Sequence, residues 1–311
     1  MTLISRLFLA PAAITGMVLF QPAAAAGQAF TPPQGVGSIT VGWQLVQNTG
    51  HRLSDGINLE QGQSLTTSAL VEVDYGVTDR MSATVGIPYV FGKYTGNGAP
   101  ISGLPHDTCR CWNSAFQDLS MSARYRLGDG RWALTPNVTV GAPSHNYEYV
   151  GEAVVGRNLR ELQLGVAGAL KLGHVLPKAS VQGSYTYAFV QRAIEDIRID
   201  RSNARFEFGY GITRGIYVRG DANWQRTNGG LRVGSPTGIP FPFPGELNTP
   251  EKYAQRDRLV RVNYWHAGAG VSFPVGRSDI FVSFTKYISG TDTHNGQAYT
   301  VGSTWYFDRS R

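Results

Sequence analysis

The chain has 311 residues, of which 42% are hydrophobic and 16% charged, and its formal net charge at pH 7 is +6. The basic residues are spread along the chain without a run, which argues against a nucleic-acid-binding protein because such proteins concentrate positive charge in a patch. The counts of Gly (38), Tyr (15), Phe (14) and Trp (6) are typical of a chain of strands and turns.

The first 26 residues have the organisation of a secretory signal. Arg6 precedes an apolar run over residues 7–20, and small residues follow in "QPAAAAGQAF". This order predicts a signal peptide that is cleaved near Ala25 or Ala26. The run is shorter than the about 20 residues of a membrane-spanning helix. We therefore expect an exported protein in which residues 27–311 form one domain.

The remaining chain alternates apolar and polar residues with the period of a β-strand. In "YGVTDRMSATVGIPYVF", apolar side chains occupy every second position from Met81 to Phe91. This segment follows "GVGSITVGWQLV" and "QSLTTSALVEVDY". The later segments with the same alternation are "FQDLSMSARYRL", "WALTPNVTVGA", "LRELQLGVAGALKL", "ASVQGSYTYAF", "ARFEFGYGI", "IYVRGDANWQ", "RLVRVNYWHAGAGVSF", "DIFVSFTKYIS" and "QAYTVGSTWYF". Together they predict about twelve strands.

The predicted connections alternate between short and long. The short ones are 76–80, 128–131, 173–177, 213–215 and 274–278, and the long ones are 49–62, 94–115, 143–157, 190–201, 228–256 and 289–296. Short periplasmic turns opposite long external loops are typical of outer-membrane barrels. The predicted fold is therefore an all-β, up-and-down antiparallel transmembrane β-barrel with lipid outside and a polar lumen inside. A soluble β-sandwich is the alternative.

The last strand carries a feature of its own. Trp305 and Phe307 end an alternating run in an aromatic-x-Phe pattern. The pattern resembles the C-terminal signal that the barrel insertion machinery of the outer membrane reads, although "DRSR" follows it here. We expect this machinery, outer-membrane lipid and lipopolysaccharide to be partners of the chain.

Three stretches resemble an outer-membrane family named for the meta-pathway of phenol degradation. They are the hairpin "YGVTDRMSATVGIPYVF", the strand "QDLSMSARYRL" and the proline-containing strand "LTPNVTVGAP". Gln117 stands where that family usually has Gly before the Asp. The resemblance covers most of the chain after the signal. It implies a transporter of small, often aromatic, molecules, and it carries over no functional residues.

Charged residues recur on the face of the strands that the alternation directs inward. They predict a narrow, weakly selective polar pathway; a salt-bridged plug that conducts little is the alternative. The predicted pore-lining residues are Glu72, Asp74, Asp118, Arg124, Arg126, Glu161, Lys171, Arg205, Glu207, Arg219, Asp221 and Arg261.

Two predicted external loops have distinctive sequences. "HDTCRCW" holds both cysteines, and because exported thiols usually oxidise we expect Cys109 and Cys111 in a disulfide, within or between chains. A soft metal bound by this loop is the lesser alternative. "GSPTGIPFPFPGEL" places Ile239, Phe241 and Phe243 among prolines, which predicts a stiff lid or capture surface, or simply an exposed loop.

Catalysis is the rival class of function. None of the six histidines has Ser two places on, the spacing that outer-membrane phospholipases use, and His145 follows Ser144 directly. We therefore expect no catalytic residues, no metal and no cofactor. The predicted function is passive uptake of small, aromatic or hydrophobic, solutes across the outer membrane. The alternatives are a structural or adhesion barrel acting through its loops and, behind it, a lipid hydrolase.

Overall fold

The computed structural model describes residues 29–59, 63–96, 104–173, 175–213, 215–232 and 246–308. The predicted signal peptide therefore lies outside the described residues. So do Ile239, Phe241 and Phe243, the predicted lid of the proline-rich loop.

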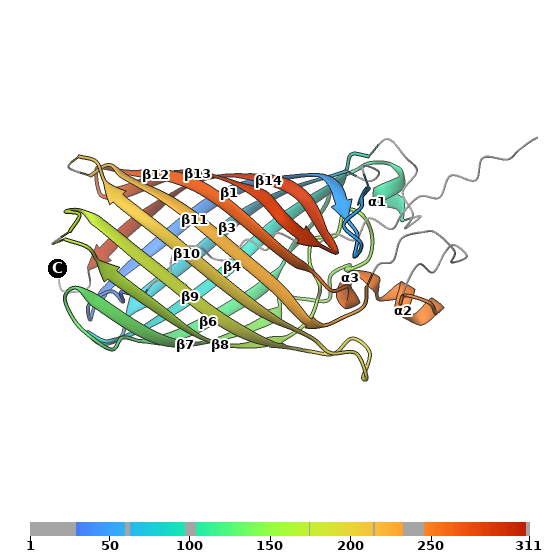
Figure 1. Cartoon of the computed structure of the whole chain (residues 1–311), viewed down its shortest axis with the longest axis horizontal. Helices are drawn as coiled ribbons and strands as arrows, with labels where there is room; N and C mark the ends of the chain where they lie inside the picture. The colour runs from blue at the N-terminus through green and yellow to red at the C-terminus, as the bar shows by residue number, and fades with distance from the viewer. Residues whose placement is uncertain are drawn as a thin grey trace, which may run out of the picture.

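Twelve antiparallel positions close into a barrel in the described part of the chain (Figure 1). Closure comes from β1 (Val36–Arg52), which pairs with β14 (Thr293–Asp308) from Val36↔Asp308 to Arg52↔Thr293. The other strands are β3 (Ser64–Gly76), β4 (Met81–Tyr94), β5 (Asn113–Phe116), β6 (Asp118–Tyr125), β7 (Trp132–Pro143), β8 (Glu161–Lys171), β9 (Ala179–Val190), β10 (Ile199–Gly211), β11 (Tyr217–Gly229), β12 (Asn263–Val275) and β13 (Ser278–Thr291). The predicted barrel and its strand number are confirmed.

Strands β5 and β6 share one position beside β4. The break between them is Gln117, whose N–H donates to the carbonyl of Pro88 at 2.9 Å. A two-residue strand, β2 (Asn58–Leu59), pairs with the end of β1.

Three short helices lie at one end of the barrel (Figure 1). They are α1 (Pro105–Thr108), α2 (Pro250–Ala254) and α3 (Arg256–Leu259). We call this the loop end and the opposite one the turn end. None of the helices in the described ranges is long and apolar enough to cross a bilayer.

The apolar face of the strands is the outer surface of the barrel. One cross-strand row runs from Val282 through Val301, Trp43 and Ala69 to Tyr89, each residue paired with the next. Val282, Val301 and Trp43 are 45–47% exposed. Thr40 and Glu72, which point to the face opposite this row, are 5% and 2% exposed. A soluble protein buries its apolar side chains. Here the apolar side chains are exposed and the polar ones are buried, as expected for a barrel surrounded by lipid.

The predicted long connection 289–296 is wrong. Strands β13 and β14 are joined by Asp292 alone, with φ of 51°. The polar residues around it pair across the sheet: His294 lies opposite His51, and Thr293 opposite Arg52. The barrel wall here extends beyond the band of apolar side chains on its outer surface. A polar stretch of sequence therefore need not be a loop. For the same reason β1 reaches Arg52, into the predicted connection 49–62.

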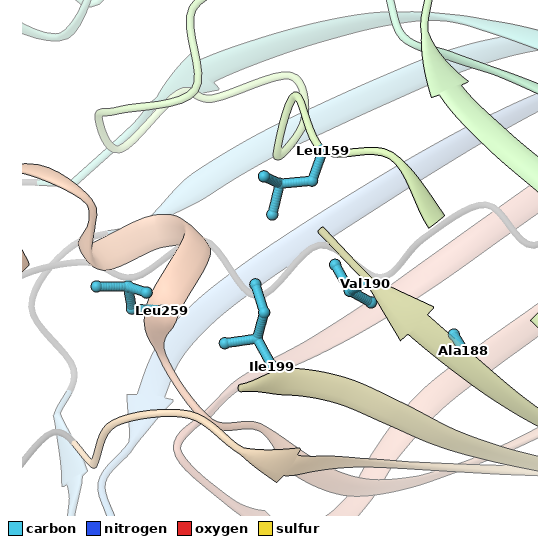
Figure 2. Packing of buried hydrophobic residues seen from close by; sticks show 5 residues of the cluster. All are labelled: Leu159, Ala188, Val190, Ile199 and Leu259. Carbon is cyan, nitrogen blue, oxygen red and sulfur yellow. The ribbon is translucent and has the colours of Figure 1, made fainter. Parts of the chain in front are cut away.

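The predicted strand that included Arg261 is also wrong at its start. Residues 256–259 form α3, and β12 begins only at Asn263. Leu259 is apolar because it packs on the inner side of the loop end, with Leu159, Ala188, Val190 and Ile199 (Figure 2). In the sequence, apolar residues that hold a loop against the barrel thus resemble the start of a strand.

The described N-terminal residues lie inside the barrel. Ala29 packs on Ala133 and Ala167, and its N–H donates to the side-chain oxygen of Gln182 at 3.2 Å. The segment passes Gly76, where a Cβ atom would lie 2.0 Å from the carbonyl oxygen of Pro33. It therefore covers part of the inner wall, over β7, β8 and β9.

Candidate transport lumen

A cavity of about 440 Å³ lies inside the barrel. Most of its wall comes from β9 to β14 with β1 and β3, and Phe30 of the N-terminal segment borders it as well. Its charged and aromatic lining residues include Glu72, Arg205, Glu207, Arg219, Asp221, Asp279, Tyr217, Tyr264, His266 and Phe281. Five of the predicted pore-lining residues, Glu72, Arg205, Glu207, Arg219 and Asp221, thus border this cavity.

Glycines make room for the side chains of β11. A Cβ atom at Gly209 would lie 1.6 Å from the Tyr217 hydroxyl oxygen, and one at Gly270 3.1 Å from Nε of Arg219. Both glycines are register partners of Arg219, one on each neighbouring strand. The side chains of β11 therefore lie along the wall instead of across the lumen, which keeps the cavity open.

The charges that border the cavity are partly compensated. Nη2 of Arg205 lies 2.9 Å from the Glu207 carboxylate, and the Asn223 amide donates to Asp221 at 2.6 Å. Arg219 makes no ion pair with any described residue. A polar solute in the cavity would thus meet both an anion and a cation on neighbouring positions of one strand.

Three predicted pore-lining residues, Asp74, Arg124 and Glu161, are held in ion pairs away from this cavity. Nη2 of Arg124 lies 2.7 Å from both carboxylate oxygens of Asp74, and the Thr84 hydroxyl donates to the same carboxylate at 2.9 Å. Arg201 pairs with Glu161 nearer the loop end. These side chains fill part of the interior, as the predicted alternative of a salt-bridged plug requires.

The remaining predicted residues lie near the two ends. Asp118 accepts a hydrogen bond from the hydroxyl of Tyr147. Lys171 lies 4.7 Å from the ring centroid of Phe30. Arg126 follows the end of β6 and donates to the carbonyl of Asp79 at 2.8 Å, so it belongs to the turn end.

Arg261 is placed wrongly by the sequence. It lies between α3 and β12, and its N–H donates to the carbonyl of Leu231 at 2.9 Å. Because the residue is not in a strand, the alternation that directed it into the lumen does not apply.

Two buried carboxylates hold loop backbone at the loop end. Asp107 of α1 accepts the N–H groups of Glu152 and Ala153 at 2.8 and 3.0 Å, and Asp257 of α3 accepts that of Gly151 at 3.1 Å. Residues 151–156 are buried. We call Asp107, Asp257 and the segment 151–153 the loop latch.

Burial governs the electrostatics of the latch. It raises the pKa of Asp257 to about 6, although Arg256 close by opposes the shift. Sequence reasoning missed Asp257 altogether and included Asp107 only within the cysteine loop "HDTCRCW", as part of a possible soft-metal site. A lone carboxylate in a loop gives no pattern from which its backbone partners could be found.

The cysteine loop lies next to the latch. Cys109 and Cys111 form a disulfide with Cα atoms 5.2 Å apart. His106 lies 3.4 Å from Asp107 and 3.2 Å from Glu148. Within the described ranges, no group of three or more His, Cys, Asp or Glu side chains is arranged to hold a metal ion.

Ser144 and His145 interact, although adjacent residues of a strand would point to opposite faces. The Ser144 hydroxyl lies 2.9 Å from Nδ1 of His145 because both residues follow the end of β7 and escape the alternation of a strand. Among the described residues, we find no carboxylate hydrogen-bonded to His145. The pair therefore lacks the orienting third group of a catalytic triad.

Comparisons with known proteins support the fold. No family model and no curated protein matches the chain. The structure is similar to an outer membrane channel from Pseudomonas putida F1, with a TM-score of 0.67 and 14% identity over 90% of this chain and 98% of that one. It is also similar to the translocator domain of the autotransporter NalP from Neisseria meningitidis, with a TM-score of 0.53 and 11% identity over 89% and 90% of the two chains. At these identities the likeness concerns the fold alone, which is that of an outer-membrane β-barrel.

Proposed function

We propose that this protein is an outer-membrane channel for the passive uptake of small, aromatic or hydrophobic, solutes. The observation that carries the proposal is a closed barrel with apolar side chains outside and a cavity of about 440 Å³ inside. The similarity to an outer membrane channel supports it. Export by a signal peptide and membership of the phenol meta-pathway family belong to the same proposal. So does insertion through Trp305 and Phe307, both exposed at the turn end.

The cavity suits a solute with an apolar body and a hydrogen-bonding group. Phe30, Phe281 and Tyr264 offer ring faces, whereas Arg219 and Asp221 offer charge. Aromatic rings contact the apolar part of a ligand, and the few polar groups fix the orientation of the ligand.

Passage requires movement at the loop end. The latch carboxylates hold the segment 151–153 inward, and a Cβ atom at Gly92 would lie 2.7 Å from the carbonyl oxygen of Ala153. We therefore place the gate at the loop latch and the solute site in the cavity beneath it.

Conductance in planar bilayers tests the proposal. Asp107→Ala removes two hydrogen bonds of the latch and should raise the open probability of single channels. In that background, Arg219→Gln should shift ion preference toward cations, and Asp221→Asn toward anions. Asp129→Asn, in an exposed pair at a turn, is the matched control and should change nothing.

A structural barrel is the second candidate because of the buried pairs Asp74–Arg124 and Glu161–Arg201. It predicts no current from the wild type or from Asp107→Ala, together with unchanged solute uptake by cells that lack the protein. That combination would remove the transport proposal. An esterase assay on lipid substrates addresses the hydrolase alternative, which predicts turnover that Ser144→Ala abolishes.

A further inference from the structure

Five aromatic rings form a connected cluster on the outer surface near the loop end. Tyr89 lies 4.8 Å, centroid to centroid, from both Phe91 and Phe116. Phe91 also contacts Trp43 at 6.0 Å and Trp112 at 6.5 Å. We call these five residues the outer aromatic patch.

The patch is open to the surroundings of the barrel. Trp43, Trp112 and Phe116 are 45%, 48% and 50% exposed. The rings come from β1, β4, β5 and the residue that follows the disulfide, so the fold gathers residues that are distant in sequence. At the turn end, by comparison, Tyr75 and Phe307 form a stacked pair at 6.4 Å.

A cation lies over one of the five rings. Nζ of Lys93 is 5.8 Å from the centroid of Trp112. Lys93 makes no ion pair with any described residue, and β1, β4 and β5 contain neither Asp nor Glu. The charge thus faces outward with an aromatic neighbour and without an ion-pair partner among the described residues.

The height of Lys93 along the barrel indicates the partner. It is the last residue but one of β4 at the loop end, about 7 Å along the strand beyond Phe91. Aromatic side chains gather where acyl chains meet headgroups, and lysines reach past them toward phosphates. In an outer membrane, the lipid with several acyl chains and phosphates in the external leaflet is lipopolysaccharide.

We propose that the outer aromatic patch binds one lipopolysaccharide molecule, with its acyl chains against the rings and a phosphate of its lipid A on Nζ of Lys93. The proposal requires that the barrel lies in the outer membrane with its loop end outside, and it is independent of transport. A protein that does not conduct could still bind the lipid, and a channel could lack the site.

Binding of hexa-acylated diphosphoryl lipid A to the detergent-purified barrel, measured by native mass spectrometry, tests this site. We expect one lipid A per barrel. Lys93→Gln should weaken binding about fivefold, as for one basic residue near an anionic lipid surface. Trp112→Ala, in a loop, should weaken it about tenfold through lost apolar contact.

The controls separate this site from general lipid contact. Arg277→Gln and Trp132→Ala remove an exposed cation and an exposed ring at the turn end and should bind as the wild type does. With dephosphorylated lipid A, Lys93→Gln should match the wild type. Reduced gel mobility on boiling verifies that each variant is folded. Equal binding of phosphatidylglycerol and lipid A, or Lys93→Gln and Trp112→Ala variants indistinguishable from the controls, would overturn the proposal.

Discussion

At the scale of single residues, the interior charges divide into those fixed in buried pairs and those that border the cavity. Arg124 is 1% exposed and is held by Asp74, whereas Arg219 lines the cavity. A buried charge is tolerated only when it is paired, because desolvation is costly. The first kind therefore depends on its partner, and the second remains available to a solute.

Loss of one partner should expose this difference. Asp74→Ala removes the carboxylate that lies 2.7 Å from the buried Arg124 guanidinium, and should cost about 3–5 kcal/mol of unfolding free energy. Asp129→Ala, which breaks the exposed pair with Arg80, should cost less than about 1 kcal/mol. Urea titrations in lipid vesicles measure both. Equal losses in the two variants would contradict the buried pairing.

The latch gives a pH dependence at a single carboxyl. In the closed latch the pKa of Asp257 is about 6, above its ordinary 3.8, because burial outweighs the attraction of Arg256 and Arg157 while Asp107 adds to the rise. Between these values the closed state binds a proton that a solvated Asp257 does not. Lowering the pH from about 7 to about 5 should therefore favour the closed state and reduce conductance.

Asp257→Asn should abolish most of this dependence and keep the channel closed at both pH values. Asp55→Asn, in an exposed loop, is the matched control and should retain the wild-type response. Single-channel recordings at the two pH values decide the outcome. Conductance that rises on acidification in the wild type would show that the sign is wrong.

At the scale of elements, period-two alternation predicts a strand wherever one face meets lipid and the other the lumen. It succeeds for β3 and β4, whose outward residues are apolar from Ala69 to Val73 and from Met81 to Phe91. It fails at residues 289–296 and at Arg261, where the wall or the loops lie above the apolar band. There the outward side chains meet water or protein instead of lipid. Whether a residue is polar therefore no longer indicates the face of the strand on which it lies.

The candidate site is predictable only in part for a related reason. Inward parity identifies Arg205, Glu207, Arg219 and Asp221, because a strand fixes the side of each residue. Nothing local indicates which inward charges are sequestered in pairs, since the partners lie on other strands. Asp74 and Arg124, for example, are 50 residues apart.

Glycines on the inner wall should control the width of the lumen. In Gly209→Ala the new methyl group would meet the Tyr217 hydroxyl, which must turn into the cavity and should lower the conductance of the latch-open Asp107→Ala channel. The double change with Tyr217→Ala should restore it. Gly220→Ala, where the nearest atom is 3.9 Å away, should be neutral. Equal conductance in Gly209→Ala and Gly220→Ala would contradict this role.

At the scale of the whole molecule, the barrel exchanges the usual positions of apolar and polar side chains. Pairing between β1 and β14 joins the two edges of the described sheet, as a barrel in hydrocarbon requires because unpaired backbone groups are costly there. The channel, the latch and the lipopolysaccharide site all presuppose that the outer face meets acyl chains.

Cysteine scanning along β1 tests this premise most directly. Single cysteines at Thr40, Val41, Gln44 and Leu45, placed in the protein inserted in vesicles, are probed with a membrane-confined and a small water-soluble thiol reagent. We predict that positions 41 and 45 react with the membrane-confined reagent, and positions 40 and 44 with the water-soluble one. Reaction of all four positions with the water-soluble reagent alone would contradict the account.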